Sequence, residues 1–161
     1  MKFIYNDGGR QSAGYKGQTS DCVTRAIAIV TDKPYQEVYD TLNSLIKTKS
    51  KGYKLIKTAY GNQYVRSYGS ARTGINKKVY HNYLLSLSYK WIPTMFIGKG
   101  CKVHLKESEL PKGRLVVRLS KHLTSVIDGV INIIVTFLKQ VTYNNEQTFK
   151  LDTIDIEYKL K

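Results

Sequence analysis

The order of hydrophobic patterns along the chain is the strongest constraint on its fold. Before about residue 90, apolar residues recur at the spacing of helices, and after Trp91 they occur in short runs rich in β-branched residues. Three such runs cover residues 114–119, 123–127 and 130–138. Helices that come first and strands that come after predict an α+β fold, with N-terminal helices packed on a C-terminal antiparallel β-sheet.

The boundaries of three helices can be predicted from capping residues and prolines. The first is expected to begin at or just after residues 19–21, which are all N-cap types, with Cys22 in its first turn, and four apolar residues follow at helical spacing: Val23, Ala26, Ile27 and Val30. Pro34 ends this helix and opens a second. Asn76 is expected to cap a third.

The remaining segments have weaker patterns. Residues 47–74 show no sustained period, so we expect a long excursion with one short strand near 63–66. A short helical piece is expected to end at Leu110-Pro111. Asp128-Gly129 between two apolar runs predicts a two-residue hairpin turn.

The N-terminal segment combines a strand with an unusually long loop. Residues 3–5 suggest a short strand, and a glycine-rich loop follows up to residue 20. Long irregular loops in compact domains are usually functional or mobile. The chain shows no internal repeat or linker, so residues 1–161 are expected to form a single domain, with the place of the strands after about residue 133 left open.

The net charge points to an anionic partner. Lysine and arginine number 26 against 12 acidic residues, which gives a formal charge of +14. Such a charge attracts nucleic acid, an acidic protein or a membrane surface. The lysines are scattered rather than clustered, so a surface that only confers solubility is an equally good interpretation.

The cysteines and hydropathy indicate a cytoplasmic protein. Cys22 and Cys101 are too few for a disulfide framework, no charged-then-apolar leader opens the sequence, and no apolar stretch approaches the roughly 18 residues of a membrane span. Cys101 and His104 lack a second pair of ligands for zinc. We therefore expect no metal, no cofactor and no membrane association.

Cys22 is the best candidate nucleophile. A thiolate in the first turn of a helix is stabilised by unpaired N–H groups, although the adjacent Asp21 opposes a second negative charge. A nucleophilic cysteine also needs a base within hydrogen-bonding reach. His81 is expected on a solvated helix and His104 in local packing, whereas His122 begins a strand and can face a helix N-terminus.

Two groups of residues resemble the papain-like cysteine peptidase superfamily, and within it small phage and bacterial proteins. The resemblance covers roughly residues 1–130 and rests on Asn6-Asp7-Gly8-Gly9-Arg10 with Asp21-Cys22-Val23-Thr24-Arg25-Ala26-Ile27-Ala28, and on Lys121-His122-Leu123-Thr124-Ser125-Val126-Ile127-Asp128-Gly129. It implies a papain-like fold, a nucleophile at Cys22 and a base at His122. It also implies a phage-encoded protein acting in the host cytoplasm.

The remaining papain-like groups are harder to assign. The superfamily places an Asn or Asp on the strand after the histidine, and Asn132 is the candidate. A two-residue turn at Asp128-Gly129 pairs Ser125 with Asn132, which puts Asn132 on the face opposite His122 unless a bulge intervenes. For the oxyanion donor, Gln18 is the nearest candidate and Asn6 is an alternative.

Three functions therefore remain open. The first is a cysteine hydrolase or peptidase that performs acyl transfer with a Cys22–His122 dyad on a protein or peptide substrate. The basic charge of the protein would suit an acidic substrate. The second is a catalytically inactive papain-like scaffold that binds a phage or host protein. The third is a nucleic-acid-binding protein, whose stacking residues would lie among the basic residues between Lys51 and Arg72: Tyr53, Tyr60, Tyr64 and Tyr68.

Overall fold

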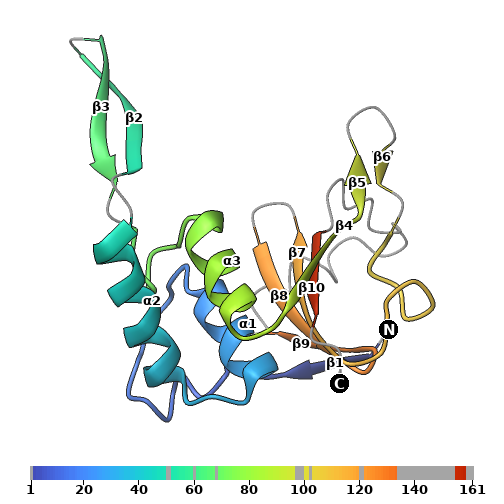
Figure 1. The fold of residues 1–161 in the computed structure, drawn as a ribbon. Helices are drawn as coiled ribbons and strands as arrows, with labels where there is room; N and C mark the ends of the chain where they lie inside the picture. Colours follow the sequence, from blue (N-terminus) through green and yellow to red (C-terminus); the bar gives the residue numbers. More distant parts are fainter. Residues whose placement is uncertain are drawn as a thin grey trace.

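The protein combines three helices with a six-stranded sheet (Figure 1). The computed structural model describes residues 2–49, 52–59, 61–67, 69–96, 100–101, 103–119, 122–133 and 155–158, and the numbers of helices and strands refer to these ranges. The helices are α1 (Cys22–Thr31), α2 (Tyr35–Lys49) and α3 (Lys77–Ser86). All three lie where the capping and proline signals predict, and Asn76 Oδ1 accepts a hydrogen bond from the Lys78 amide at the start of α3.

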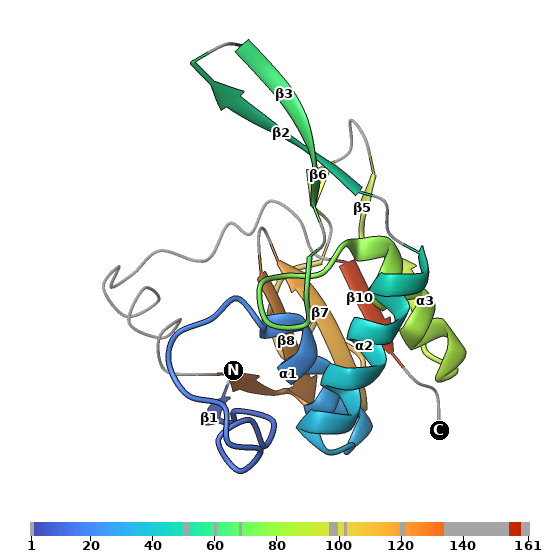
Figure 2. The same ribbon diagram turned by 90° about the vertical axis from the view of Figure 1, so that its left-hand side faces the viewer.

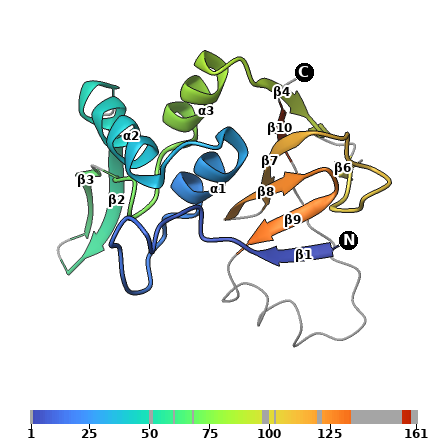
Figure 3. The same ribbon diagram turned by 90° about the horizontal axis from the view of Figure 1, so that it is seen from below.

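The six-stranded sheet has the order β1-β9-β8-β7-β10-β4. Its strands are β1 (Lys2–Tyr5), β4 (Lys90–Pro93), β7 (Arg114–Leu119), β8 (His122–Ile127), β9 (Val130–Ile133) and β10 (Asp155–Tyr158). All neighbours are antiparallel except β1, which pairs in parallel with β9 (Figure 3). The expected purely antiparallel, C-terminal sheet is therefore wrong in this respect. A parallel neighbour requires a long connection, and most of the chain lies between these two strands.

Helix α1 is the centre of the fold. It lies between α2 on one side and strands β7 and β8 on the other (Figures 1 and 3). Every residue from Val23 to Val30 is buried, as expected for a helix covered on all sides. The side chains of Ile27, Val38, Leu84 and Val116 join the helices to the sheet in one core. Cys22 is therefore the first residue of a helix that is buried in the core.

The hairpin β8–β9 agrees with the sequence prediction. Both turn residues have positive φ, 49° at Asp128 and 84° at Gly129, as a two-residue Asp-Gly turn requires. Ser125 pairs with Asn132 in the register, without a bulge. The Asp128 carboxylate accepts a hydrogen bond from the Gly113 amide at 2.9 Å, so Asp128 is a turn residue.

Two local predictions are corrected. Within residues 47–74 the chain forms a two-stranded hairpin of β2 (Gly52–Thr58) and β3 (Gly61–Ser67), which projects away from the helices (Figure 2). Residues 103–110 form turns instead of a helix; Glu109 and Leu110 both donate their amides to the Lys106 carbonyl. Short apolar segments with one turn of helical spacing do not distinguish a turn from a helix.

Several further predictions concern residues outside the described part. They are the turn at 98–99, the continuation of the 130–138 strand after Ile133, and the hairpin around Asn144-Asn145. The side chains of the four tyrosines assigned to nucleic-acid stacking also lie outside it. A last pair of short strands is β5 (Met95–Phe96) and β6 (Gly100–Cys101). No helix in the described ranges is long and apolar enough to cross a membrane.

Candidate active site

Cys22 and His122 are brought together where α1 packs on β8. Cys22 is the first residue of the helix and His122 the first residue of the strand, and both side chains are half-buried. Two cavities are lined by both residues. One, of about 20 Å³, also contacts Asn6, Arg25 and Asn132. The other, of about 260 Å³, lies on the side of α3 and the end of β7.

His122 is held in its neutral form. Burial lowers its pKa from 6.5 to about 4, and the positive charge of Arg25 contributes to the same shift. At neutral pH the imidazole therefore has one nitrogen free of a proton, which can accept a proton from a thiol. The lowered pKa also makes the imidazole a weaker base, so His122 is neutral at rest and would carry a proton only transiently.

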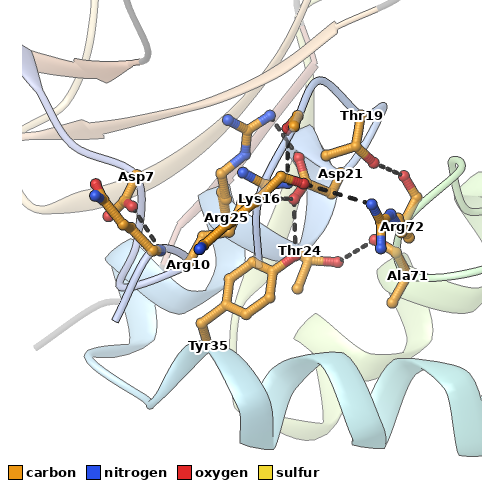
Figure 4. Close-up of polar contacts among 12 residues, drawn as sticks. Asp7, Arg10, Lys16, Thr19, Asp21, Thr24, Arg25, Tyr35, Ala71 and Arg72 are labelled. Atoms are coloured by element: carbon orange, nitrogen blue, oxygen red, sulfur yellow. Dashed lines mark hydrogen bonds and ion pairs between the residues drawn. The ribbon is translucent and has the colours of Figure 1, made fainter. Parts of the chain in front are cut away.

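The charge of Asp21 is balanced by two arginines (Figure 4). This carboxylate, whose residue is only 1% exposed, contacts Arg10 Nε at 2.9 Å and an Arg25 terminal nitrogen at 2.6 Å. The Tyr35 hydroxyl donates a hydrogen bond to it at 2.7 Å, and burial together with this bond raises the pKa of Tyr35. The expected opposition between Asp21 and a Cys22 thiolate is thus offset by two cations. Asp21 occupies the N-cap position of α1 but its side chain caps no amide, which corrects that part of the prediction.

Arg10 also orders the glycine-rich loop. Its terminal nitrogen donates hydrogen bonds to the carbonyls of Lys16 at 3.0 Å and Gly17 at 2.8 Å (Figure 4). The Asp7 carboxylate accepts from the amides of Gly9 and Gln11 at the start of the loop. The loop is therefore fixed against α1 by the same arginine that neutralises Asp21.

Replacement of Gly8 by alanine is expected to destabilise the protein by about 2 kcal/mol. Gly8 has φ +67°, and a Cβ there would lie 3.0 Å from the Arg25 carbonyl oxygen, inside α1. The comparison variant is Gly14→Ala, at φ +83° with no atom within 4 Å of the added Cβ. It should cost about 1 kcal/mol, for backbone conformation alone. Equal losses in urea unfolding would show that the close approach of the loop to α1 contributes nothing.

Asn132 and Asn6 meet at the small cavity. Asn132 Oδ1 accepts a hydrogen bond from Asn6 Nδ2 at 3.1 Å, and Asn132 Nδ2 donates to the Val130 carbonyl at 3.1 Å. Both asparagines line the cavity that His122 also lines. The strand register is the predicted one, yet Asn132 and His122 still reach one cavity. Asn6 comes to Asn132 because it directly follows β1, which pairs with β9.

The other candidate residues lie elsewhere. Gln18 is exposed in the loop and does not belong to the described residues that line either Cys22 cavity. His81 packs edge-on against Trp91, and His104 Nδ1 lies 2.9 Å from Glu109 Oε2. The Cys101 side chain is outside the described part, and within that part no group of three or more potential metal ligands occurs.

Neither arginine of the site was assigned a role from the sequence alone. Asp21 and Arg25 are spaced i,i+4 at the start of a predicted helix, which is a recognisable ion-pair signal. Arg10 gave no such signal, because its contact with Asp21 depends on how the loop folds back. Comparisons with protein-family models, curated proteins and solved structures find no match for this chain.

Proposed function

We propose that the protein is a cysteine hydrolase of the papain-like type, which transfers an acyl group through Cys22 with His122 as general base. The observation that supports this most is that residues so distant in sequence line the same two cavities. A helix N-terminus that carries the cysteine and a strand that carries the histidine are also the arrangement implied by the resemblance to that superfamily.

The reaction begins with proton transfer from the Cys22 thiol to the neutral imidazole of His122. The sulfur then attacks the carbonyl carbon of an amide, a C–S bond forms, and the carbonyl electrons move to oxygen. Collapse of this intermediate breaks the C–N bond, and the leaving amine takes the proton from His122. Water then attacks the thioester, with His122 accepting its proton, and returns the carboxylic acid and the free thiol.

The start of α1 is suited to stabilise the oxyanion. The first N–H groups of a helix have no acceptor within the helix, and the side chain of Asp21 does not cap them. Their dipoles favour negative charge at that point. The amides of Cys22 and Val23 are therefore assigned as the oxyanion donors, in place of Gln18 and Asn6. Asn132 and Asn6 are assigned to hold the wall of the small cavity beside the imidazole.

Alkylation of Cys22 by iodoacetamide tests the dyad. At about pH 7, His122→Ala should slow the reaction about tenfold, because no imidazole is then present to accept the proton of the thiol. Because His122 stays unprotonated down to about pH 4, the difference should persist at about pH 5. The matched control is His81→Ala, which removes a histidine of α3 that lines neither cavity.

The experiment is done in a Cys101→Ser background so that one thiol reports. A Cys22 that reacts at the same rate with and without His122 would contradict the proposal. That result would favour the inactive scaffold as the function of this fold.

A further inference from the structure

The larger of the two Cys22 cavities has a distinctive charge. Its volume of about 260 Å³ is close to the lower end of the range for small-ligand sites, and Cys22 and His122 lie at one wall. The aliphatic part of its lining comes from Val23, Ile75, Leu119 and Leu123. The charged residues are Lys77 and Arg118, and none of the described lining residues is an aspartate or glutamate.

Lys77 is held in place by an aromatic ring. Its ammonium sits over the Trp91 ring, 4.8 Å from the centroid. A cation–π contact of this kind restrains the side chain without neutralising it. Lys77 is the first residue of α3, so its backbone is fixed by the helix.

Arg118 lies at the end of β7 nearest to His122. In the register of the sheet, the next residue, Leu119, pairs with His122, and Arg118 pairs with Leu123. Its guanidinium is charged at any pH at which the protein folds. Arg118 is also in register with Asp155 of β10, the strand on the other side of β7. Because Arg118 has an acidic residue as its neighbour in the sheet, the two cations of the cavity need to be tested separately.

The smaller cavity adds a third cation on the other side of the dyad. Arg25 has a side chain only 9% exposed, and its Nε is buried without a hydrogen-bond partner among the described residues. Arg10 and Arg25 together face the single carboxylate of Asp21. Cationic side chains therefore line both of the cavities beside Cys22.

We propose that the cavity bounded by Lys77 and Arg118 selects substrates with a carboxylate close to the carbonyl carbon that Cys22 attacks. This inference rests on the proposed hydrolase function and names its substrate class, an acidic acyl group. A carboxylate in this cavity gains two cationic partners, whereas a neutral amide of the same shape gains none. A lysine side chain would be repelled.

Two alkylating reagents of nearly the same shape test the charge of the cavity without requiring catalysis. Iodoacetate carries a carboxylate next to the carbon that the thiol attacks, and iodoacetamide carries a neutral amide. The measured quantity is the ratio of their rate constants at Cys22, mapped by mass spectrometry in the Cys101→Ser background. Dividing by the same ratio for the chain unfolded in urea removes the intrinsic difference between the reagents.

The normalised ratio is expected to be about tenfold above one in the folded protein, which is the effect of about 1.4 kcal/mol. Lys77→Gln and Arg118→Gln should each lower it about threefold, and the two together should bring it close to one. The matched control is Lys78→Gln, which removes the same charge from the adjacent, exposed residue of α3 and should leave the ratio unchanged. Raising the salt from about 0.02 M to about 0.5 M should reduce the ratio in the wild type.

A normalised ratio of one, an equal fall in Lys78→Gln, or a Cys22 that reacts with neither reagent would overturn the inference. The outcome is separable from that of the hydrolase proposal. If His122→Ala changes neither rate constant and the preference for iodoacetate persists, the dyad is ruled out and the anion-selective cavity is kept. If alkylation of Cys22 depends on His122 but the normalised ratio is one, the dyad is kept and the anion-selective cavity is ruled out.

Discussion

Asp21→Asn is expected to lower the free energy of unfolding by about 3–5 kcal/mol, the usual cost of removing one partner from a buried ion pair. The substitution keeps the size of the side chain but removes the charge that Arg10 and Arg25 share. Two guanidinium groups would then remain mostly buried with no anion between them. The hydrogen bond from the Tyr35 hydroxyl loses its charged acceptor as well.

Urea unfolding followed by circular dichroism measures this loss, with Asp40→Asn as the matched control. Asp40 lies exposed on α2, where its carboxylate accepts a hydrogen bond from Gln36, and its substitution should change stability by less than about 0.5 kcal/mol. A loss below about 1 kcal/mol in Asp21→Asn would contradict this expectation, because it would mean that water already solvates the arginines. The ion pairs of Asp21 with Arg10 and Arg25 would then not hold the glycine-rich loop against α1.

The same cluster shows why part of the site could not be predicted. The first helix, with Cys22 in its first turn, follows from local signals: N-cap residues, apolar spacing and a proline stop. That Asp21 is buried follows from none of these, because its burial depends on Arg10, which a glycine-rich loop brings back onto α1. An acidic residue before a helix normally indicates a cap, and in this protein the ion pairs replace that role.

The sheet divides in the same way into local and non-local features. A two-residue turn fixes the register of its hairpin, so the pairing of Ser125 with Asn132 was predictable from Asp128-Gly129 alone. The place of β1 beside β9 was not, because no turn links the two strands. That pairing is what brings Asn6 to Asn132, so the small cavity could be completed only from the folded structure.

Helix α1 explains why the approach of His122 to Cys22 was partly predictable. The apolar residues of this helix recur at helical spacing and need a covering partner, and a chain of helices followed by strands makes the sheet one such partner. A histidine at the start of a strand that packs on this helix can then lie near the N-terminus of the helix. The approach of His122 to the helix was predicted from patterning, whereas the burial and the Arg25 charge that lower its pKa depend on tertiary packing.

The stability of the protein is expected to fall by about 2–3 kcal/mol between about pH 6.5 and about pH 4 because of His122 alone. In the folded protein the pKa of His122 is lowered from 6.5 to about 4, first by burial and then by Arg25. Between those two values the unfolded chain binds a proton that the folded chain does not. Stability therefore decreases as the pH falls through this window and is unaffected by His122 above it.

Urea unfolding at about pH 7, 5.5 and 4 measures the effect as a difference between the wild type and His122→Gln, which has no titrating ring. The difference should favour the variant increasingly as the pH falls, whereas His81→Gln should keep the wild-type slope because His122 is still present. Parallel curves for the wild type and His122→Gln would show that His122 titrates as in water. In that case the imidazole would be protonated near pH 6 and could no longer accept the Cys22 proton there, so the acid limit of the proposed hydrolase would move up with it.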